Sequence, residues 1–280
     1  MKKTEILTAK SIAVAGSKYL VAGAWALLAL FPFLWIFLNS FKSNEEIYAS
    51  PFRLPESFSF KNFQEAWLTA KIGTYFFNSI LVAFGSVLVL ALIAAMVSYY
   101  VSRISPNKLL YTFFTLGIMI PYHAMLIPTF IMLRNVDLLN SRFGLALVYC
   151  AVNLALSVFI LVGFMKGIPI DIEEAAVIDG ATVYRTFFEI ILPIAKPGIA
   201  TILTLSFLNA WNEFLFAQVL ISNPVFKTLT QGILSLRGQY ATDYGLMSAG
   251  LVITIIPVVI IYIFFQEQVV KGMTAGAVKG

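Results

Sequence analysis

Residues 171–193 read DIEEAAVIDGATVYRTFFEIILP, and this organised polar stretch lies between two long apolar blocks of the chain. Asp171 and Glu174 have the D-x-x-E spacing of a capping box, which predicts a short helix over residues 172–178. Gly180 is suited to end that helix, because glycine readily adopts the left-handed conformation found just after a helix C-terminus. The stretch therefore begins with a short helix that has both a start and a stop signal.

The second half of the same stretch predicts another helix. Thr182 is a suitable N-cap for a helix that runs from residue 183 toward residue 192, and Pro193 is expected to stop it. Pro197 then opens the next apolar block. We predict a helix, a tight turn and a second helix at the inner membrane surface; an ordinary surface loop is the alternative.

The composition indicates that lipid is the main solvent of this chain. Hydrophobic residues make up 60% of the sequence and charged residues 12%, whereas soluble domains are about half apolar and about a quarter charged. The mean hydropathy is +0.88. Apolar blocks of about twenty residues have the length that an α-helix needs to cross a bilayer. The sequence predicts an all-α, polytopic membrane protein.

We predict six transmembrane helices in a single transmembrane domain over residues 1–280. The even number places both termini on one side, and the lysine-rich N-terminus favours the cytoplasm. On this topology the longest loop, 167–196, and the tail, 267–280, are cytoplasmic, and the inner segments hold just over half of the 19 basic residues. The predicted helices cover residues 19–41, 75–101, 109–133, 144–166, 197–220 and 246–268.

Several other classes of function lack a sequence signal. The net charge of +5 comes from Lys and Arg scattered through loops, so no nucleic-acid partner is expected. No G-x-x-x-x-G-K-[ST] stretch is present, so this chain is not expected to bind ATP. The single histidine, His123, lies between Pro121 and Pro128, where we expect a broken helix and a structural role for the ring. One histidine does not make a metal site, so no metal is expected.

Polar side chains inside a membrane span are costly and are therefore candidates for a solute pathway. In the fifth predicted helix, Asn209, Asn212 and Glu213 share a face, and Trp211 lies beside them. Amide and carboxylate groups next to an aromatic ring suit a hydroxylated solute. The favoured alternative is that these groups form hydrogen bonds between helices.

The fourth predicted helix carries a second polar stripe. Tyr149, Asn153 and Ser157 follow one another at the i,i+4 spacing that places residues on one helix face. We expect this stripe either to line the solute pathway or to pack between helices.

The stretch at 171–193 and the first residues after it resemble the EAA loop of the permeases of ABC importers. In that family the loop is the coupling helix, which docks on an ATP-binding subunit and converts ATPase closure into movement of the membrane helices. The resemblance thus implies a coupling role for eight residues. The residues that carry it are Glu174, Ala175, Ala176, Asp179, Gly180, Ala181, Phe187, Ile190, Leu192, Pro193 and Pro197. The eight implied coupling residues are Glu174, Ala175, Ala176, Asp179, Gly180, Ala181, Leu192 and Pro193.

Further stretches at 39–42, 77–80, 211–214 and 266–280 are similar to the carbohydrate-uptake branch of this family, in particular to the second permease of maltose-type importers. The resemblance implies a transport subunit, not an enzyme, that forms a pathway for a sugar or oligosaccharide by alternating access. It implies a second permease, a pair of ATP-binding subunits that carry ATP and Mg, and an extracytoplasmic solute-binding protein. It also implies the inner membrane of a bacterium or archaeon, with no cofactor on this chain.

Two other functions are weaker alternatives. An ion-coupled secondary carrier of a small polar solute needs intramembrane acids or histidines, and Glu213 is the one acidic residue in that position. An intramembrane enzyme is disfavoured because H-E-x-x-H is absent and no set of Ser, His and acid converges. Both alternatives leave the organised stretch at 171–193 unexplained.

Overall fold

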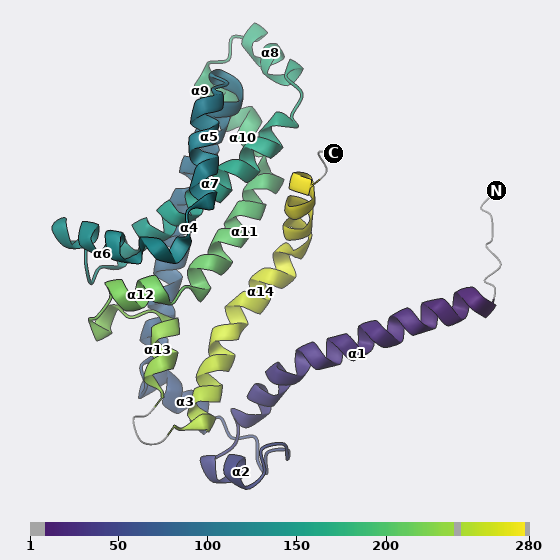
Figure 1. The fold of residues 1–280 in the computed structure, drawn as a ribbon, viewed down its shortest axis with the longest axis vertical. Coiled ribbons are helices and arrows are strands. Elements are labelled where there is room, and N and C mark those ends of the chain that lie inside the picture. The colour runs from purple at the N-terminus through teal and green to yellow at the C-terminus, as the bar shows by residue number, and fades with distance from the viewer. Residues whose placement is uncertain (1–8, 238–241, 278–280) are drawn as a thin grey trace. The chain divides into compact units, whose positions relative to one another are not determined.

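A computed structural model describes residues 9–237 and 242–277 of the chain, and side chains within 16–237 and 242–267. Every regular element in this described part is a helix, which confirms the predicted all-α class (Figure 1). The N-terminal Lys2 and Lys3 and the side chains of the tail beyond Glu267 lie outside the described residues.

Four helices in the described part are long and apolar enough to cross a membrane without interruption. They are α1 (Ala9–Asn39), α4 (Ile72–Tyr99) with its π-helical continuation η1 (Tyr100–Ile104), α7 (Arg142–Lys166) and α14 (Tyr244–Ala277). Their membrane-spanning parts, Gly16–Asn39, Ile72–Ile104, Arg142–Lys166 and Tyr244–Glu267, match four of the predicted spans to within three residues at each end, although the helices α1 and α14 extend further.

The span predicted at 109–133 is broken, as the two prolines indicated. Its first half is α5 (Lys108–Leu116) with η2 (Gly117–Met119), and its second half is η3 (Tyr122–Met125) with α6 (Leu126–Asn135). The two halves meet at 95°. Ile120 is extended because the ring of Pro121 disfavours the helical conformation for the residue before it.

The chain is bent a second time where the predicted loop helix meets the fifth span. The helical segments α9 (Val183–Arg185), η4 (Thr186–Ile191) and α10 (Leu192–Ile194) meet α11 (Lys196–Asn212) at 73°. The prediction that Pro193 stops the loop helix was wrong. Pro193 instead lies near the end of the continuous helical run 183–194, and the bend falls at Ala195.

The span predicted at 197–220 is also interrupted. Pro197 lies in the first turn of α11, as predicted, but α11 ends at Asn212. Glu213 has an extended backbone, and the short helix α12 (Leu215–Leu220) follows. Each bent or interrupted region leaves backbone groups that must find partners outside a regular helix.

The chain forms two compact units, which we describe separately. The first comprises residues 1–69 and 236–253 and includes α1, α2 (Asn44–Ala49) and α3 (Lys61–Leu68). Within it, the Asn62 amide donates to the carbonyls of Ser40 at 3.0 Å and Lys42 at 2.8 Å. Backbone N–H groups of Ser43 and Glu56 donate to the Glu46 carboxylate and hold its pKa below the ordinary value. The stretch at 39–42 is therefore part of a hydrogen-bonded loop.

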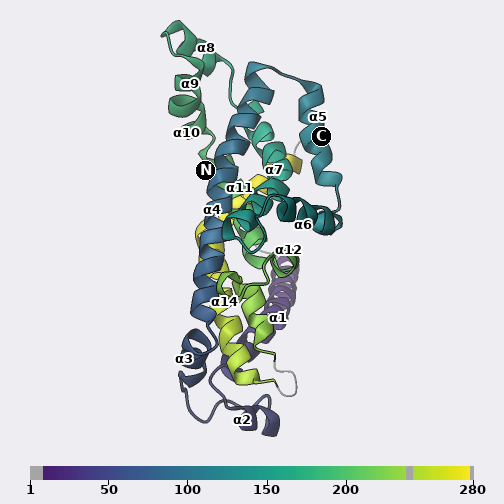
Figure 2. The same ribbon diagram turned by 90° about the vertical axis from the view of Figure 1, so that its left-hand side faces the viewer.

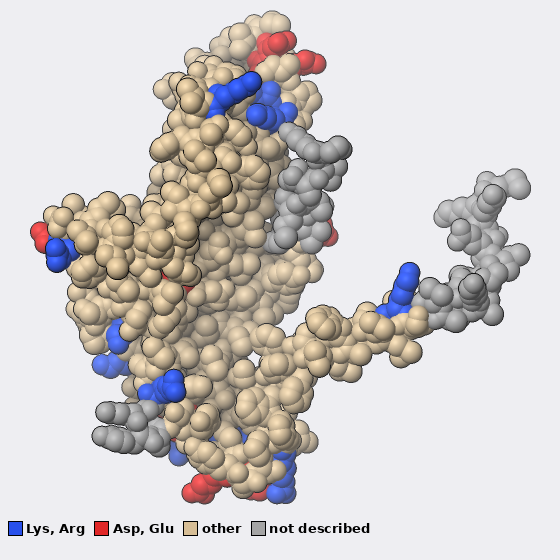
Figure 3. All heavy atoms as spheres, viewed as in Figure 1, with Lys and Arg blue, Asp and Glu red and all other residues tan. Residues whose placement is uncertain are grey.

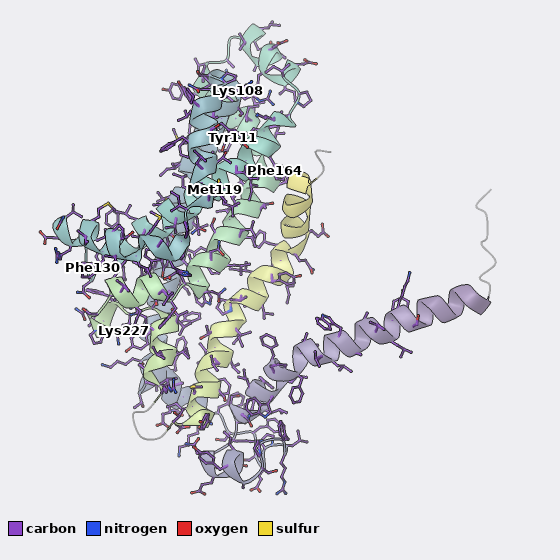
Figure 4. All side chains as sticks on the ribbon, viewed as in Figure 1. Lys108, Tyr111, Met119, Phe130, Phe164 and Lys227 are labelled. Carbon is purple, nitrogen blue, oxygen red and sulfur yellow. The ribbon has the colours of Figure 1, made fainter. Side chains whose placement is uncertain are left out.

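The second unit comprises residues 70–235 and 254–280 and has α4, α7 and α11 side by side at its centre (Figures 1 and 2). Ala94 on α4, Val158 and Leu161 on α7 and Ile202 on α11 are almost fully buried. Small residues allow close approach: a Cβ atom on Gly198 of α11 would lie 2.7 Å from the Phe164 ring on α7, which is labelled in Figure 4.

Next to this core, α5 packs against α7. The Lys166 ammonium at the end of α7 lies 5.1 Å from the centroid of the Tyr111 ring, and Figure 4 shows Tyr111 and Lys108 on α5. A cation over an aromatic face is attractive. On the face shown in Figure 3, acidic and basic side chains gather over α8 and the neighbouring end of the unit, whereas the surface along the packed helices is largely uncharged.

Two side chains of the stretch at 77–80 form hydrogen bonds to the loop that precedes α13 (Leu229–Ser235). The Asn78 amide donates to the carbonyls of Val225 and Lys227, both at 2.9 Å, and its oxygen accepts from Arg142 at 3.2 Å. The Ser79 hydroxyl accepts from the Leu229 N–H at 2.8 Å. These two buried side chains therefore supply partners that the irregular backbone lacks.

We expect Asn78→Leu to lower the free energy of unfolding by about 2–4 kcal/mol, because two carbonyls and a guanidinium lose their buried partner. Thermal unfolding of the purified protein in detergent measures the effect. Asn223→Ala is the matched control: Asn223 is exposed, accepts from Val225 N–H, and is expected to cost about 1 kcal/mol or less. Equal unfolding midpoints for Asn78→Leu and the control would contradict the assignment.

Candidate functional site

The break in the third span opens onto a cavity of about 730 Å³ in the second unit. Its walls come from the broken span, from α7 and from the region where α11 gives way to α12. Most of the wall is apolar, with residues such as Ile118, Leu156 and Leu208. The polar lining residues are Tyr122, His123, Asn153, Asn209, Asn212 and Glu213.

Three asparagines form the polar wall of this cavity. The Asn209 amide donates to the Asn153 oxygen at 3.1 Å, and the Asn153 amide donates to the Tyr149 carbonyl at 2.8 Å. The exposed Asn212 donates to the Leu208 carbonyl at 2.9 Å, one helical turn before it. An asparagine side chain has two N–H donors and an oxygen with two lone pairs, and these bonds use only part of that set. The cluster therefore retains hydrogen-bonding capacity toward the cavity.

Glu213 borders the cavity, but its carboxylate is held by the protein. Its oxygens accept from the Tyr149 hydroxyl at 2.8 Å and from the backbone N–H groups of Phe216 at 2.8 Å and Ala217 at 3.0 Å. The carboxylate thus caps α12 and links it to α7. Only 8% of Glu213 is exposed. These contacts favour the interhelical role over direct contact with a solute.

Three of the other candidate pathway residues lie between helices and do not line this cavity. The Ser157 hydroxyl donates to the Asn153 carbonyl at 2.8 Å and lies 3.4 Å from the Ser206 hydroxyl on α11. Trp211 donates from its indole nitrogen to the Thr254 carbonyl at 3.1 Å and stacks on Phe207. Tyr149 is buried, and its hydroxyl donates to the Glu213 carboxylate.

His123 lies at the predicted break in the third span, but it borders the cavity rather than the packed interior. Its side chain is exposed and lines the cavity, with its ring edge-on to the Tyr122 ring at a centroid distance of 5.0 Å. The two flanking prolines were the signal for this position, because they mark the break that turns this segment toward the cavity.

The second part of the site is the loop at 171–193. Its first helix is α8 (Asp171–Ile178), and the predicted capping box is wrong: Ile170 is the N-cap residue and no side chain caps the helix. Asp171 lies inside the first turn. It and two glutamates in that turn interact favourably with the positive end of the helix dipole instead.

The turn after α8 is as predicted. Gly180 has φ +77°, and the Gly180 and Ala181 N–H groups donate to the carbonyls of Val177 at 3.0 Å and Ala176 at 2.9 Å. The Thr182 hydroxyl accepts from the Arg185 N–H at 3.3 Å, which confirms it as an N-cap. The loop therefore contains the predicted helix, tight turn and second helix.

The eight predicted coupling residues fall on different faces of this loop. Ala176 is 5% exposed and packs inward, so α8 has one face toward the protein. The other face is open to solvent or to a partner. Glu174, Ala175, Asp179, Gly180 and Pro193 are exposed, and Ala181 and Leu192 are half-buried.

The open face of the loop also carries apolar side chains that sequence reasoning missed. Val177 is 67% exposed, Ile178 is 86% exposed and Tyr184 is 75% exposed. Exposed apolar side chains that lie together can form part of a contact surface. Their presence in an otherwise polar loop was the available signal.

Comparison with known proteins identifies the class to which this architecture belongs. Residues 87–275 match the family model described as binding-protein-dependent transport system inner membrane component. The chain is 37% identical over 256 residues to the diacetylchitobiose uptake system permease protein NgcG of Streptomyces coelicolor, covering 90% of this chain and 85% of that one. It is 35% identical to the sulfoquinovosyl glycerol transport system permease protein SmoH of Agrobacterium fabrum, covering 94% and 93%.

A solved structure has the same fold. A chain of a bacterial ABC transporter involved in the import of the acidic polysaccharide alginate superposes with a TM-score of 0.81. The two chains are 24% identical, and the match covers 93% of this chain and 98% of the other.

The apolar helices, the cavity and the organised loop define a polytopic membrane permease. The chain belongs to the family of binding-protein-dependent transport system inner membrane components. It is a permease subunit of an ABC importer and not an enzyme. Family membership thus decides against the ion-coupled carrier and the intramembrane enzyme.

Proposed function

We propose that this chain and a second permease subunit form the pathway by which a neutral sugar or short oligosaccharide crosses the inner membrane of a bacterium or archaeon. An extracytoplasmic solute-binding protein delivers the solute. A pair of ATP-binding subunits, which carry ATP and Mg, docks on the loop at 167–196. Both termini are cytoplasmic in this arrangement, and transport proceeds by alternating access.

The cavity with its three asparagines is the observation that carries the proposal. Amide groups donate to and accept from hydroxyl groups, and the apolar wall around them suits the C–H faces of a sugar ring. None of the described residues that line the cavity is Lys or Arg, and the Glu213 carboxylate is already bonded. These features favour an uncharged, hydroxylated solute over an anionic one.

The names of the relatives support a sugar or oligosaccharide as the solute, whereas the preference for a neutral one rests on the cavity lining alone. NgcG and SmoH are named for diacetylchitobiose and for sulfoquinovosyl glycerol, and a third relative, from Streptococcus mutans, is a multiple sugar-binding transport system permease protein that is 32% identical to this chain. The exposed face of α8 supports the coupling role, since it offers acidic and apolar side chains to a protein partner.

Uptake into liposomes tests the proposal. The chain is purified with its partner permease and ATP-binding subunits, reconstituted with ATP inside, and supplied with the binding protein and labelled diacetylchitobiose or maltotriose. We expect ATP-dependent uptake of at least one neutral oligosaccharide and none of labelled methionine. Uptake of methionine, or of acidic oligosaccharides alone, would contradict the proposed solute class.

We expect Asn212→Leu to raise the solute concentration needed for half-maximal uptake by about tenfold, because one hydrogen bond is worth about 1.4 kcal/mol. The yield of the assembled complex should stay the same, since Asn212 is exposed to the cavity. Asn223→Leu, outside the cavity, serves as the control. An unchanged concentration dependence for Asn212→Leu would exclude Asn212 from solute contact.

A further inference from the structure

One arginine joins the end of α7 to α8 within the second unit. Arg103 lies in η1, directly after α4, and 9% of its side chain is exposed. Its guanidinium donates to the carbonyls of Met165 in the last turn of α7 and of Ile168 just after that helix, and its Nε lies 3.3 Å from a carboxylate oxygen of Glu173 on α8. The last carbonyls of a helix have no partner within the helix, so Arg103 supplies one.

Tyr99 contacts the same loop from the preceding turn of α4. Its hydroxyl donates to the other carboxylate oxygen of Glu173 at 3.1 Å. Its ring lies 5.1 Å from the ring of Phe187, a residue of η4 that is 5% exposed. Tyr99 therefore holds the first helix of the loop through Glu173 and the second helical segment through Phe187.

The π-helical turn in η1 places Arg103 for these contacts. The Ser105 N–H donates to the Tyr100 carbonyl at 3.0 Å, five residues back. A π turn adds a residue and rotates the side chains that follow it relative to a continuous α-helix. Arg103 thereby faces the end of α7 and α8.

Among the acidic residues of α8, Glu173 alone has a described ion pair to the membrane helices. Asp171 and Glu174 are exposed, and 12% of the Glu173 side chain is exposed. The contrasting pair on the same loop, Arg185 and Glu189, lies 2.9 Å apart with side chains 64% and 62% exposed. Exposed pairs contribute little, whereas a nearly buried charge that loses its partner is costly.

We propose that Arg103, Tyr99 and Glu173 form the link that transmits displacement of α8 to α4 and α7. The inference rests on the proposed docking of ATP-binding subunits at the open face of α8. Movement of α8 pulls on Glu173, and Glu173 acts on α4 through both Tyr99 and Arg103. Arg103 acts on α7, which carries Asn153 in the cavity wall. These are positioning residues that touch neither solute nor ATP.

Glu173→Gln tests the link because it removes the charge and keeps the shape of the side chain. The reporter is a single cysteine, Asn212→Cys in a Cys150→Ala background, on the complete reconstituted complex. Its rate of labelling by a membrane-impermeant maleimide is measured without nucleotide and after trapping with MgATP and orthovanadate. With Glu173 intact, trapping should change the labelling rate about tenfold or more, as a coupled two-state change of the cavity requires.

In Glu173→Gln we expect the labelling rate to change by less than about twofold on trapping, which corresponds to loss of most of the coupling. The ATP-binding subunits should still copurify and hydrolyse ATP. Tyr99→Phe, which keeps the ring against Phe187, should give an intermediate response. In a double-mutant cycle, the effects of Arg103→Met and Glu173→Gln should add to less than their sum, because both changes remove the Arg103–Glu173 contact.

Glu189→Gln is the control on the same loop and should respond to trapping like the unmodified chain. An equal loss in this control, or a full response in Glu173→Gln, would overturn the proposed link. Parallel loss of complex yield, hydrolysis and labelling response in Glu173→Gln and Tyr99→Phe would also overturn it, because the residues would then be needed for folding alone. Failure of the unmodified chain to copurify with ATP-binding subunits would instead contradict the proposed function.

Discussion

Glu213→Leu is expected to prevent recovery of the assembled permease. The substitution leaves the Tyr149 hydroxyl and the N–H groups of Phe216 and Ala217 without their shared acceptor. Each unsatisfied buried donor costs about 1–3 kcal/mol, so we expect the free energy of unfolding to fall by roughly 3–6 kcal/mol. Such a loss is comparable to the whole stability of many folded proteins.

The measurement is the yield of monodisperse protein from detergent, together with its thermal unfolding midpoint. Asn212→Leu is the matched control, because Asn212 is the neighbouring residue and faces the cavity. We expect the control to be recovered normally and to change only the concentration dependence of uptake. Normal recovery of Glu213→Leu with altered solute selectivity would show that the carboxylate contacts the solute instead.

Gly180→Pro is expected to reduce ATP-driven uptake by at least tenfold while the chain still inserts and folds. Gly180 has φ +77°, whereas the proline ring fixes φ near −65°. The substitution also removes the N–H that donates to the Val177 carbonyl. The turn must therefore rearrange, and α8 changes its direction relative to the segment that begins at Thr182.

Asn is the best control at this position, because it tolerates the left-handed conformation better than other residues with a side chain. We expect Gly180→Asn to retain most of the uptake. Solute-stimulated ATPase activity and uptake are measured together in reconstituted liposomes, with Glu174→Lys as a second variant on the exposed face of α8. Both Gly180→Pro and Glu174→Lys should separate hydrolysis from uptake. Unchanged solute-stimulated hydrolysis and uptake in both would contradict the coupling role of this loop.

Local patterns in the sequence were sufficient for much of the fold. Long apolar blocks predict helices because an isolated helix satisfies its own backbone in lipid, whatever its neighbours are. Gly180, Thr182 and Pro197 were interpreted correctly for the same reason: a positive φ, an N-cap and a first-turn proline depend on residues within one turn. The break near His123 was likewise marked by Pro121 and Pro128.

Two other predictions from local patterns, the capping box at Asp171 and the helix stop at Pro193, were wrong. The D-x-x-E spacing at Asp171 resembled a capping box, but α8 begins one residue earlier relative to that pattern, and Asp171 lies within the first turn. The expected stop at Pro193 also failed, because the chain is helical on both sides of it. A capping residue or a proline restricts the backbone, yet several placements satisfy the same restriction, and packing selects among them.

The sequence by itself determined that this chain is an all-helical membrane protein with an organised loop between its fourth and fifth spans. Tertiary structure decided what the polar residues do. Glu213 caps α12 and binds Tyr149, 64 residues away, and Glu173 meets Tyr99, 74 residues away, while the adjacent Glu174 is exposed. Spacing along one helix gives a residue's face but not its neighbour across the fold, because that neighbour depends on how separate helices pack.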